Sequence, residues 1–207
     1  MSDLIREPEE KPRKKKVPRK VSRSSLMNAA VYYLQRFAAS REGVRRVLAT
    51  KVRRSLAYHG GDQEEAAAWV EEVLDTLQKQ GFLDDAAFAE ARARSLAARG
   101  TAGRAIRMKL AQKGVDKDII DDALASLAEE VGYRTGQGDD ANPDLTAAVA
   151  YARRRRLGPY RLDPDARAER REKDVAALAR QGFSPDIALK VVDAEDLADL
   201  EDEAGRV

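Results

Sequence analysis

The chain has 207 residues, of which 43% are hydrophobic and 5% aromatic, and 38 Lys and Arg nearly balance 36 Asp and Glu. It has no cysteine and one histidine, His59, which excludes disulfides, thiolate chemistry and the usual zinc ligand sets. No run approaches the roughly 18 apolar residues of a membrane span, and the N-terminus lacks the apolar region of a signal peptide. We therefore expect a soluble, cytoplasmic protein with a thin aliphatic core, which suits packed helices.

Residues 1–24 are rich in charge and proline with almost no apolar periodicity, which predicts a disordered basic arm. Its cations are Lys14, Lys15, Lys16, Arg19 and Lys20. Such an arm can hold nucleic acid by counterion release without reading its sequence. Basic tails also serve solubility alone, so the sequence leaves both roles open.

From residue 25 apolar residues recur at helical spacing, and several helix ends share a Leu followed four residues later by a Gly. The pairs are Leu56 and Gly60, Leu77 and Gly81, Leu96 and Gly100, Leu110 and Gly114, and Leu178 and Gly182. Gly adopts the left-handed conformation that ends a helix, and an apolar residue after it can contact the Leu. Asp84, Asp116 and Ser184 then cap the next helix. The connections are therefore short, which indicates an all-α fold of compact units.

The junction at residues 110–124 aligns with residues 178–192, with Leu, Gly, Asp and Ile at matching places. This repetition predicts tandem helical units, each too small to fold alone. We place a first repeat at residues 25–83, a second at 84–131, a Gly-rich linker at 132–143, and a third repeat at 144–194. Residues 195–207 form an acidic tail that we expect to be frayed.

Four segments occur in the order AAVYYLQRFAASREGVRRVL, GFLDDAAFAEARARSLAARG, IRMKLAQKGVDKDIIDDAL, and RRRRLGPYR with LARQGFSPDIALKVV. Together they resemble the RecX family of RecA regulators. Within the matched stretch the residues that we assign to the structural motif are Tyr33, Leu34, Gly81, Asp84, Asp85, Phe88, Gly100, Gly114 and Gly182. The polar AYHGGDQEE loop looks longer than the family's short turn, and so does the linker before the third repeat.

The resemblance implies three three-helix repeats in an elongated, curved array. It also implies a regulator that binds a RecA-type recombinase filament on single-stranded DNA and restrains filament growth, ATP hydrolysis and strand exchange in recombination and repair. Neither a cofactor nor a small-molecule substrate is implied, and direct contact with DNA would be weak. An independent, sequence-nonspecific DNA-binding protein is the alternative.

Cations crowd the middle helices of the first two repeats, on faces that packing does not need. They are Arg45, Arg46, Lys51, Arg53 and Arg54 in the first repeat, and Arg104, Arg107, Lys109 and Lys113 in the second. If the repeats stack into an arc, these cations would line one concave face and meet DNA phosphates or an acidic filament surface. For each residue alone, a solvated helix face is the simpler interpretation.

The run Arg153, Arg154, Arg155 and Arg156 is the densest cation cluster after the arm. Four consecutive arginines cannot share one helix face, so some pair with acids such as Asp163 and Asp165, or grip an anion. The sequence leaves both roles open.

Other motifs favour structure over chemistry. Asp84 and Asp85 are paired carboxylates at a helix start, where they satisfy free N–H groups rather than act in catalysis. The turn GTAGRAI resembles a phosphate-binding helix start only poorly. We expect Phe82 to lie in the core, and no set of nucleophile, base and orienting group can be assembled, so we predict no enzyme active site.

Overall fold

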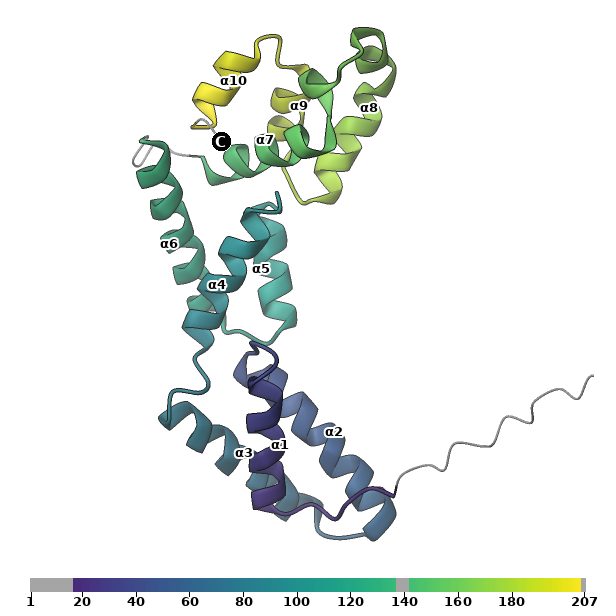
Figure 1. The fold of residues 1–207 in the computed structure, drawn as a ribbon, viewed down its shortest axis with the longest axis vertical. Coiled ribbons are helices and arrows are strands. Elements are labelled where there is room, and N and C mark those ends of the chain that lie inside the picture. Colours follow the sequence, from purple (N-terminus) through teal and green to yellow (C-terminus); the bar gives the residue numbers. More distant parts are fainter. Residues whose placement is uncertain (1–16, 137–141, 206–207) are drawn as a thin grey trace, which may run out of the picture.

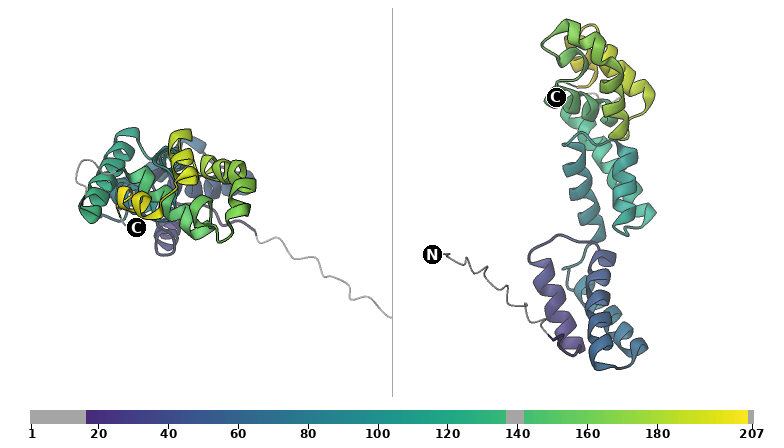
Figure 2. Two further views of the ribbon diagram at one scale, coloured as in Figure 1. Left: turned by 90° about the horizontal axis from the view of Figure 1, so that it is seen from above. Right: turned by 90° about the vertical axis from the view of Figure 1, so that its right-hand side faces the viewer.

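The computed structural model describes residues 17–136 and 142–205, which contain ten α-helices, a short 3-10 helix and no β-strand. The helices form three units that follow one another along the long axis of an elongated, curved molecule (Figures 1 and 2). The predicted all-α repeat fold is confirmed. The predictions for residues 1–16, including Lys14, Lys15 and Lys16, fall outside the described residues.

The first unit has one hydrophobic core, in which Leu26, Leu48 and Leu74 are completely buried. Its helices are α1 (Arg23–Leu34), α2 (Arg41–His59) and α3 (Gln63–Lys79). Order begins before residue 24, contrary to the predicted arm, because Val21 is buried and its N–H donates to Ser55 Oγ at 3.0 Å. The side chain of Ser22 then caps α1 in a capping box with Ser25.

The second unit packs around Ile106, Leu110 and Ile120. It consists of α4 (Asp85–Ala97), α5 (Gly103–Gln112) and α6 (Lys117–Thr135). The two long loops that the sequence predicted are shorter, since α2 continues to His59 and α6 continues past Gly132 to Thr135. Buried Val131 extends the apolar stripe of α6, which explains why the helix does not stop at residue 131.

The third unit contains a helix that the sequence analysis missed. Its elements are α7 (Pro143–Arg155), η2 (Gly158–Tyr160), α8 (Pro164–Arg180), α9 (Pro185–Asp193) and α10 (Leu197–Glu203). The acidic tail is folded rather than frayed, because Leu200 and Ala204 are buried in the core of this unit. Thr146 Oγ also donates to the Ala204 carbonyl at 2.8 Å.

The recurring Leu and Gly device ends four helices as predicted. In each case the N–H of the residue that follows the Gly donates to the carbonyl of the Leu, which is Leu77, Leu96, Leu110 or Leu178. Two expected details are wrong. Phe82 is 57% exposed while the next residue, Leu83, is buried in its place, and the side chain of Asp116 makes no cap hydrogen bond.

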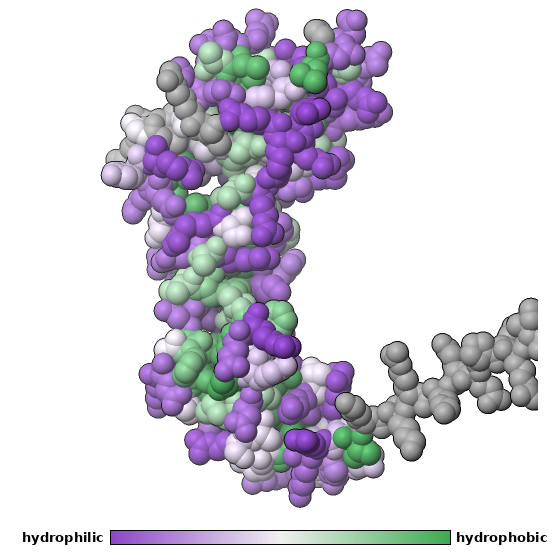
Figure 3. All heavy atoms as spheres, viewed as in Figure 1, coloured by the Kyte–Doolittle hydropathy of each residue, from purple (hydrophilic) through white to green (hydrophobic). Residues whose placement is uncertain are grey.

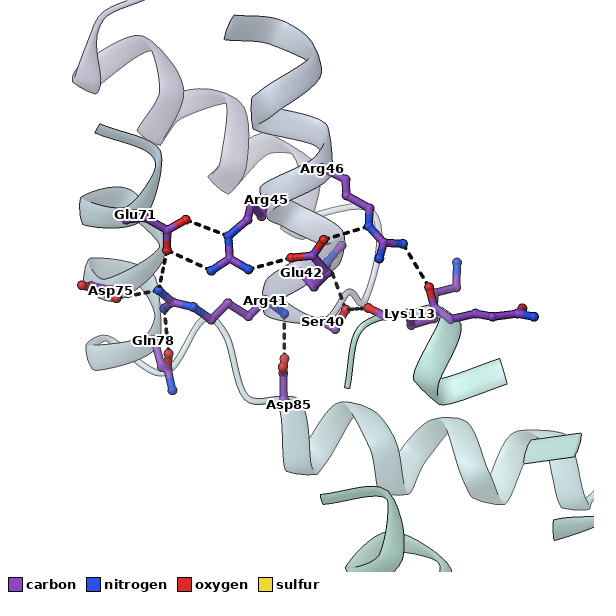
Figure 4. A network of polar contacts seen from close by, with 12 residues as sticks. Ser40, Arg41, Glu42, Arg45, Arg46, Glu71, Asp75, Gln78, Asp85 and Lys113 are labelled. Atoms are coloured by element: carbon purple, nitrogen blue, oxygen red, sulfur yellow. Dashed lines mark hydrogen bonds and ion pairs between the residues drawn. The ribbon is translucent and has the colours of Figure 1, made fainter. Parts of the chain in front are cut away.

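The two junctions between units differ in chemistry. Between the second and third units small residues pack closely: Gly100 lies against Tyr151, and Gly182 lies against Ala105. Between the first and second units the contacts are polar, and Ser40 Oγ donates to the Lys113 carbonyl at 2.5 Å while the Arg41 N–H donates to Asp85 at 2.7 Å (Figure 4). Asp85 therefore joins two units, a role that sequence reasoning did not assign to it.

Candidate functional site

The middle helices of the three units, α2, α5 and α8, lie on the same, concave side of the array (Figure 1). Each of the first two carries a set of the cations singled out from the sequence. Because a helix exposes only part of its circumference, the neighbours of each cation determine whether it can bind a partner.

Two cations of the first set have partners within the protein. Arg45 lies between Glu42 and Glu71, with hydrogen bonds of 2.6 and 2.7 Å, and Arg46 contacts Glu42 and the Gln112 carbonyl of the second unit (Figure 4). Hydrogen bonding from Arg45 lowers the pKa of Glu42 and of Glu71. Arg45 and Arg46 thus stabilise the first unit and its junction.

The rest of the first set is open to solvent. Lys51, Arg53 and Arg54 are exposed, and none has an ion-pair partner within residues 17–136 and 142–205. In the second unit Arg107 pairs with Asp121, whose pKa this contact lowers. The side chains of Arg104, Lys109 and Lys113 are exposed and have no ion pair in the described part of the chain.

Several of the cations on the first unit line a groove. Its volume is about 1140 Å³, and its walls come from α1, α2 and the segment before α1. Arg19, Arg46, Lys51 and Arg54 line it, and no Asp or Glu does so among the described residues. Tyr32 also lines the groove; it is 58% exposed, and the Arg36 guanidinium lies 4.7 Å from the ring centroid.

Sequence reasoning found the cations of this groove but not the groove. The available signal was the pair of adjacent tyrosines, of which one must point away from the core. Tyr33 lies partly buried against the core of the first unit, which leaves Tyr32 as the exposed ring.

Two of the four consecutive arginines in the third unit contact other parts of the protein, and the other two do not form ion pairs with described residues. Arg153 pairs with Glu201 of α10 at 2.5 Å, whereas the sequence suggested Asp163 or Asp165 as partners. Arg154 donates to the Arg99 carbonyl of the second unit at 2.6 Å. Arg155 and Arg156 are exposed, without an ion pair among the residues that the structure describes.

The remaining motifs are structural. Asp84 caps α4 by accepting from the Ala87 N–H at 2.9 Å. The N–H of Gly103 donates to Asp144 at 2.7 Å, so the helix start in GTAGRAI is occupied by a carboxylate of the third unit and offers no free site for a phosphate. His59 Nε2 lies 2.7 Å from the Pro18 carbonyl, which ties α2 to the segment before α1.

Within the described residues no cluster of three or more His, Asp or Glu side chains has a geometry that could hold a metal ion. No described helix is long and apolar enough to cross a membrane. The molecule is an array of three helical units, of which the third has the added helix α10, with unpaired cations on the middle helices of the first two. These features define the class of helical-repeat proteins.

Comparisons with known proteins identify the family. A model described as "RecX, second three-helix domain" matches residues 84–124. A "Regulatory protein RecX" of Myxococcus xanthus is 44% identical over 184 residues, covering 89% of this chain and 92% of that protein. One of Agrobacterium fabrum is 34% identical, covering 82% and 85% of the two chains. The chain therefore belongs to the RecX family of regulatory proteins.

Solved structures support the fold. The crystal structure of RecX from Lactobacillus salivarius matches with a TM-score of 0.55 and 23% identity, covering 83% of this chain and 94% of that one. A second crystal structure of a regulatory protein RecX has a TM-score of 0.54. The likeness extends over all three units, since 83% of the chain is covered.

Proposed function

We propose that this protein binds a RecA-type recombinase filament on single-stranded DNA and inhibits its growth, ATP hydrolysis and strand exchange in the cytoplasm. Membership of a family of regulatory proteins supports a role in control rather than in catalysis.

One observation carries the proposal. The free cations of α2 and α5 belong to two consecutive units, and both helices lie on the concave side of the array. A curved surface that repeats its charge along one axis matches a partner that is itself a repeating, anionic filament. The combined contacts of several units give avidity that no single unit would reach.

The alternative, an independent DNA-binding protein, has an observation in its favour. The groove of the first unit combines the unpaired cations Lys51 and Arg54 with an exposed tyrosine, and single-stranded nucleic acid binds to surfaces of this kind by phosphate contacts and base stacking. In the filament-binding proposal the same groove supplies a weak additional contact with DNA.

A titration separates the two functions. The protein is added to RecA filaments on single-stranded DNA, and ATP hydrolysis and filament length are followed. We expect inhibition at amounts far below those needed to coat the DNA, because one regulator on a filament stops growth of the whole end. Inhibition that begins only when the DNA is coated would support simple competition for the lattice and refute the proposal.

The free cations give the first prediction. Replacing Arg104 and Lys109 by Glu removes unpaired charge on α5, and we expect filament binding to weaken by about tenfold or more while helicity stays unchanged. The matched control replaces Lys79 and Arg134, exposed cations on α3 and α6, and changes the net charge equally. Equal weakening by the two variants would show that only net charge matters, and the concave face would lose its role.

A further inference from the structure

A second groove lies where the first unit meets the second, and its lining is mostly apolar. It has a volume of about 600 Å³ and is lined from the end of α1, the segment before α2, and α4. Figure 3 shows hydrophobic surface gathered over this part of the array. The filament proposal involves only Lys113 of this groove, and the family comparison assigns no role to its apolar lining.

Small and aromatic residues line the groove. Ala39 and Ala91 are among the small ones, and Phe37, Tyr33 and Phe88 contribute rings. Phe37 is 56% exposed although it lies 5.2 Å from the Tyr33 ring centroid, so the chain leaves much of this side chain in water. Covering such a ring releases free energy in proportion to the apolar area removed from water.

The charged residues that line the groove are cations. They are Arg92 and Lys113, and no Asp or Glu lines the groove among the described residues. Both side chains are exposed and neither has an ion pair within residues 17–136 and 142–205. The acidic tail of this chain is not free to occupy the groove, because α10 packs into the core of the third unit.

We propose that this groove binds a short acidic segment of a partner protein that inserts an aromatic or aliphatic side chain between Phe37 and α4. The apolar lining would hold the anchor, and Arg92 and Lys113 would pair with the flanking carboxylates. Apart from Lys113, which also belongs to the cation set considered for filament binding, the lining residues of this groove lie outside that set. Because it spans two units, an occupant also contacts both sides of their polar junction.

The test uses a fluorescent synthetic peptide with one Trp flanked by Asp and Glu, titrated with the full chain and followed by anisotropy. Phe37→Ser should weaken binding by about tenfold or more, because the anchor loses its main apolar contact. Phe82→Ser is the matched control: it removes the same side chain at nearly the same exposure, 57%, from a position outside the groove, and should leave binding unchanged.

Two further variants separate binding inside the groove from nonspecific hydrophobic association. Ala91→Phe adds apolar surface but occupies the groove, so it should abolish binding. Replacing Arg92 and Lys113 by Glu should also weaken binding by about tenfold and remove most of its salt dependence. Because Phe37 is exposed, replacing it should change peptide binding without unfolding the protein. Circular dichroism checks that each variant is folded.

Several results would overturn the proposal. One is equal binding of a peptide in which Gln and Asn replace the acids, and another is equal loss with Phe37→Ser and Phe82→Ser. A dimer that Phe37→Ser dissociates would identify a second copy of this chain as the occupant. Tighter peptide binding after replacement of Leu4 and Ile5 by Ser would identify the chain's own N-terminal residues instead.

Discussion

Gly114 ends α5 with a φ of 76°, and a Cβ at this position would overlap the Glu42 side chain across the junction of the first two units. Gly81 ends α3 with nearly the same φ, 75°, but nothing lies within 4 Å of its missing Cβ. The two residues share a conformation that favours glycine, and they differ in whether another unit lies against them.

This difference gives a prediction. Gly81→Ala should cost about 1 kcal/mol of unfolding free energy from backbone strain alone, and Gly114→Ala should cost at least about 1 kcal/mol more, because Glu42 must move. Chemical denaturation measures both values. Equal losses of unfolding free energy in the two variants would contradict this prediction. They would show that Glu42 can move away from residue 114 without destabilising the protein.

Asp174 is a buried carboxylate in the core of the third unit, with a relative exposure of 2%. It accepts hydrogen bonds from Arg161 at 2.5 and 2.8 Å and from the Gly158 N–H at 2.9 Å. Burial raises the pKa of Asp174, but Arg161 and Gly158 outweigh burial, so the pKa is lowered. Asp174 lies one helical turn before Leu178, on the apolar stripe of α8. That position is the sequence signal that could have predicted its burial.

The sign of the pH dependence follows. A lowered folded-state pKa contributes stability that is present above the unfolded value of about 3.9 and is lost as the pH falls through the folded value. Asp174→Asn should therefore cost about 3 kcal/mol near neutral pH and make stability less dependent on pH in the acid range. Denaturation between pH 7 and pH 3 tests this, with Asp163→Asn, which keeps a helix cap, as the control.

Among the helices, α10 departs most from expectation. Its residues are dominated by acids, which predicted a frayed tail, yet Leu200 and Ala204 fill the core beside α7 and Glu201 pairs with Arg153. Glu201 also hydrogen bonds to Tyr160, and burial together with this contact raises the pKa of Tyr160 to about 12. A short helix with one buried face can be held by its neighbours even when its composition is unfavourable for burial.

The anchor of α10 can be tested within the helix. Leu200→Ala should cost about 2 kcal/mol and increase amide exchange along α10, because a completely packed side chain leaves a cavity. Leu197→Ala is the matched control, since Leu197 is 38% exposed, and should cost much less. If exchange in α10 is already fast in the unaltered chain, the helix is not held as the structure indicates.

Over the whole array, we expect curvature to change most readily at the polar junction between the first and second units. It depends on a few hydrogen bonds from Ser40, Arg41 and Arg46, whereas the second and third units pack through glycine and alanine. In a repeat protein, the contacts between neighbours set both shape and cooperativity.

Neighbouring acids allow a matched test of this junction. Asp85→Ala removes the acceptor of the Arg41 N–H, and we expect a broader distance distribution between fluorophores on the first and third units. Asp84→Ala removes only the cap of α4, costs about 1 kcal/mol and should leave that distribution unchanged. The same distribution for both variants would place the stiffness of the array elsewhere.

The positions of most helices follow from local sequence, because caps and left-handed glycines act within a few residues of the helix end. The cations Lys51, Arg54, Arg104 and Lys109 could likewise be read from helical spacing. The pairing of Arg45 with Glu71, of Arg107 with Asp121 and of Arg153 with Glu201 could not, since each of these acids lies on another helix.

The same reason explains the other differences. Folding of the acidic tail, the bond of Asp85 across the junction and both grooves depend on residues that are distant along the chain. Local sequence therefore specifies an array of repeated helices with many cations, because its signals are short in range. Which of these cations are free, and what surface they share, depends on packing between helices and units.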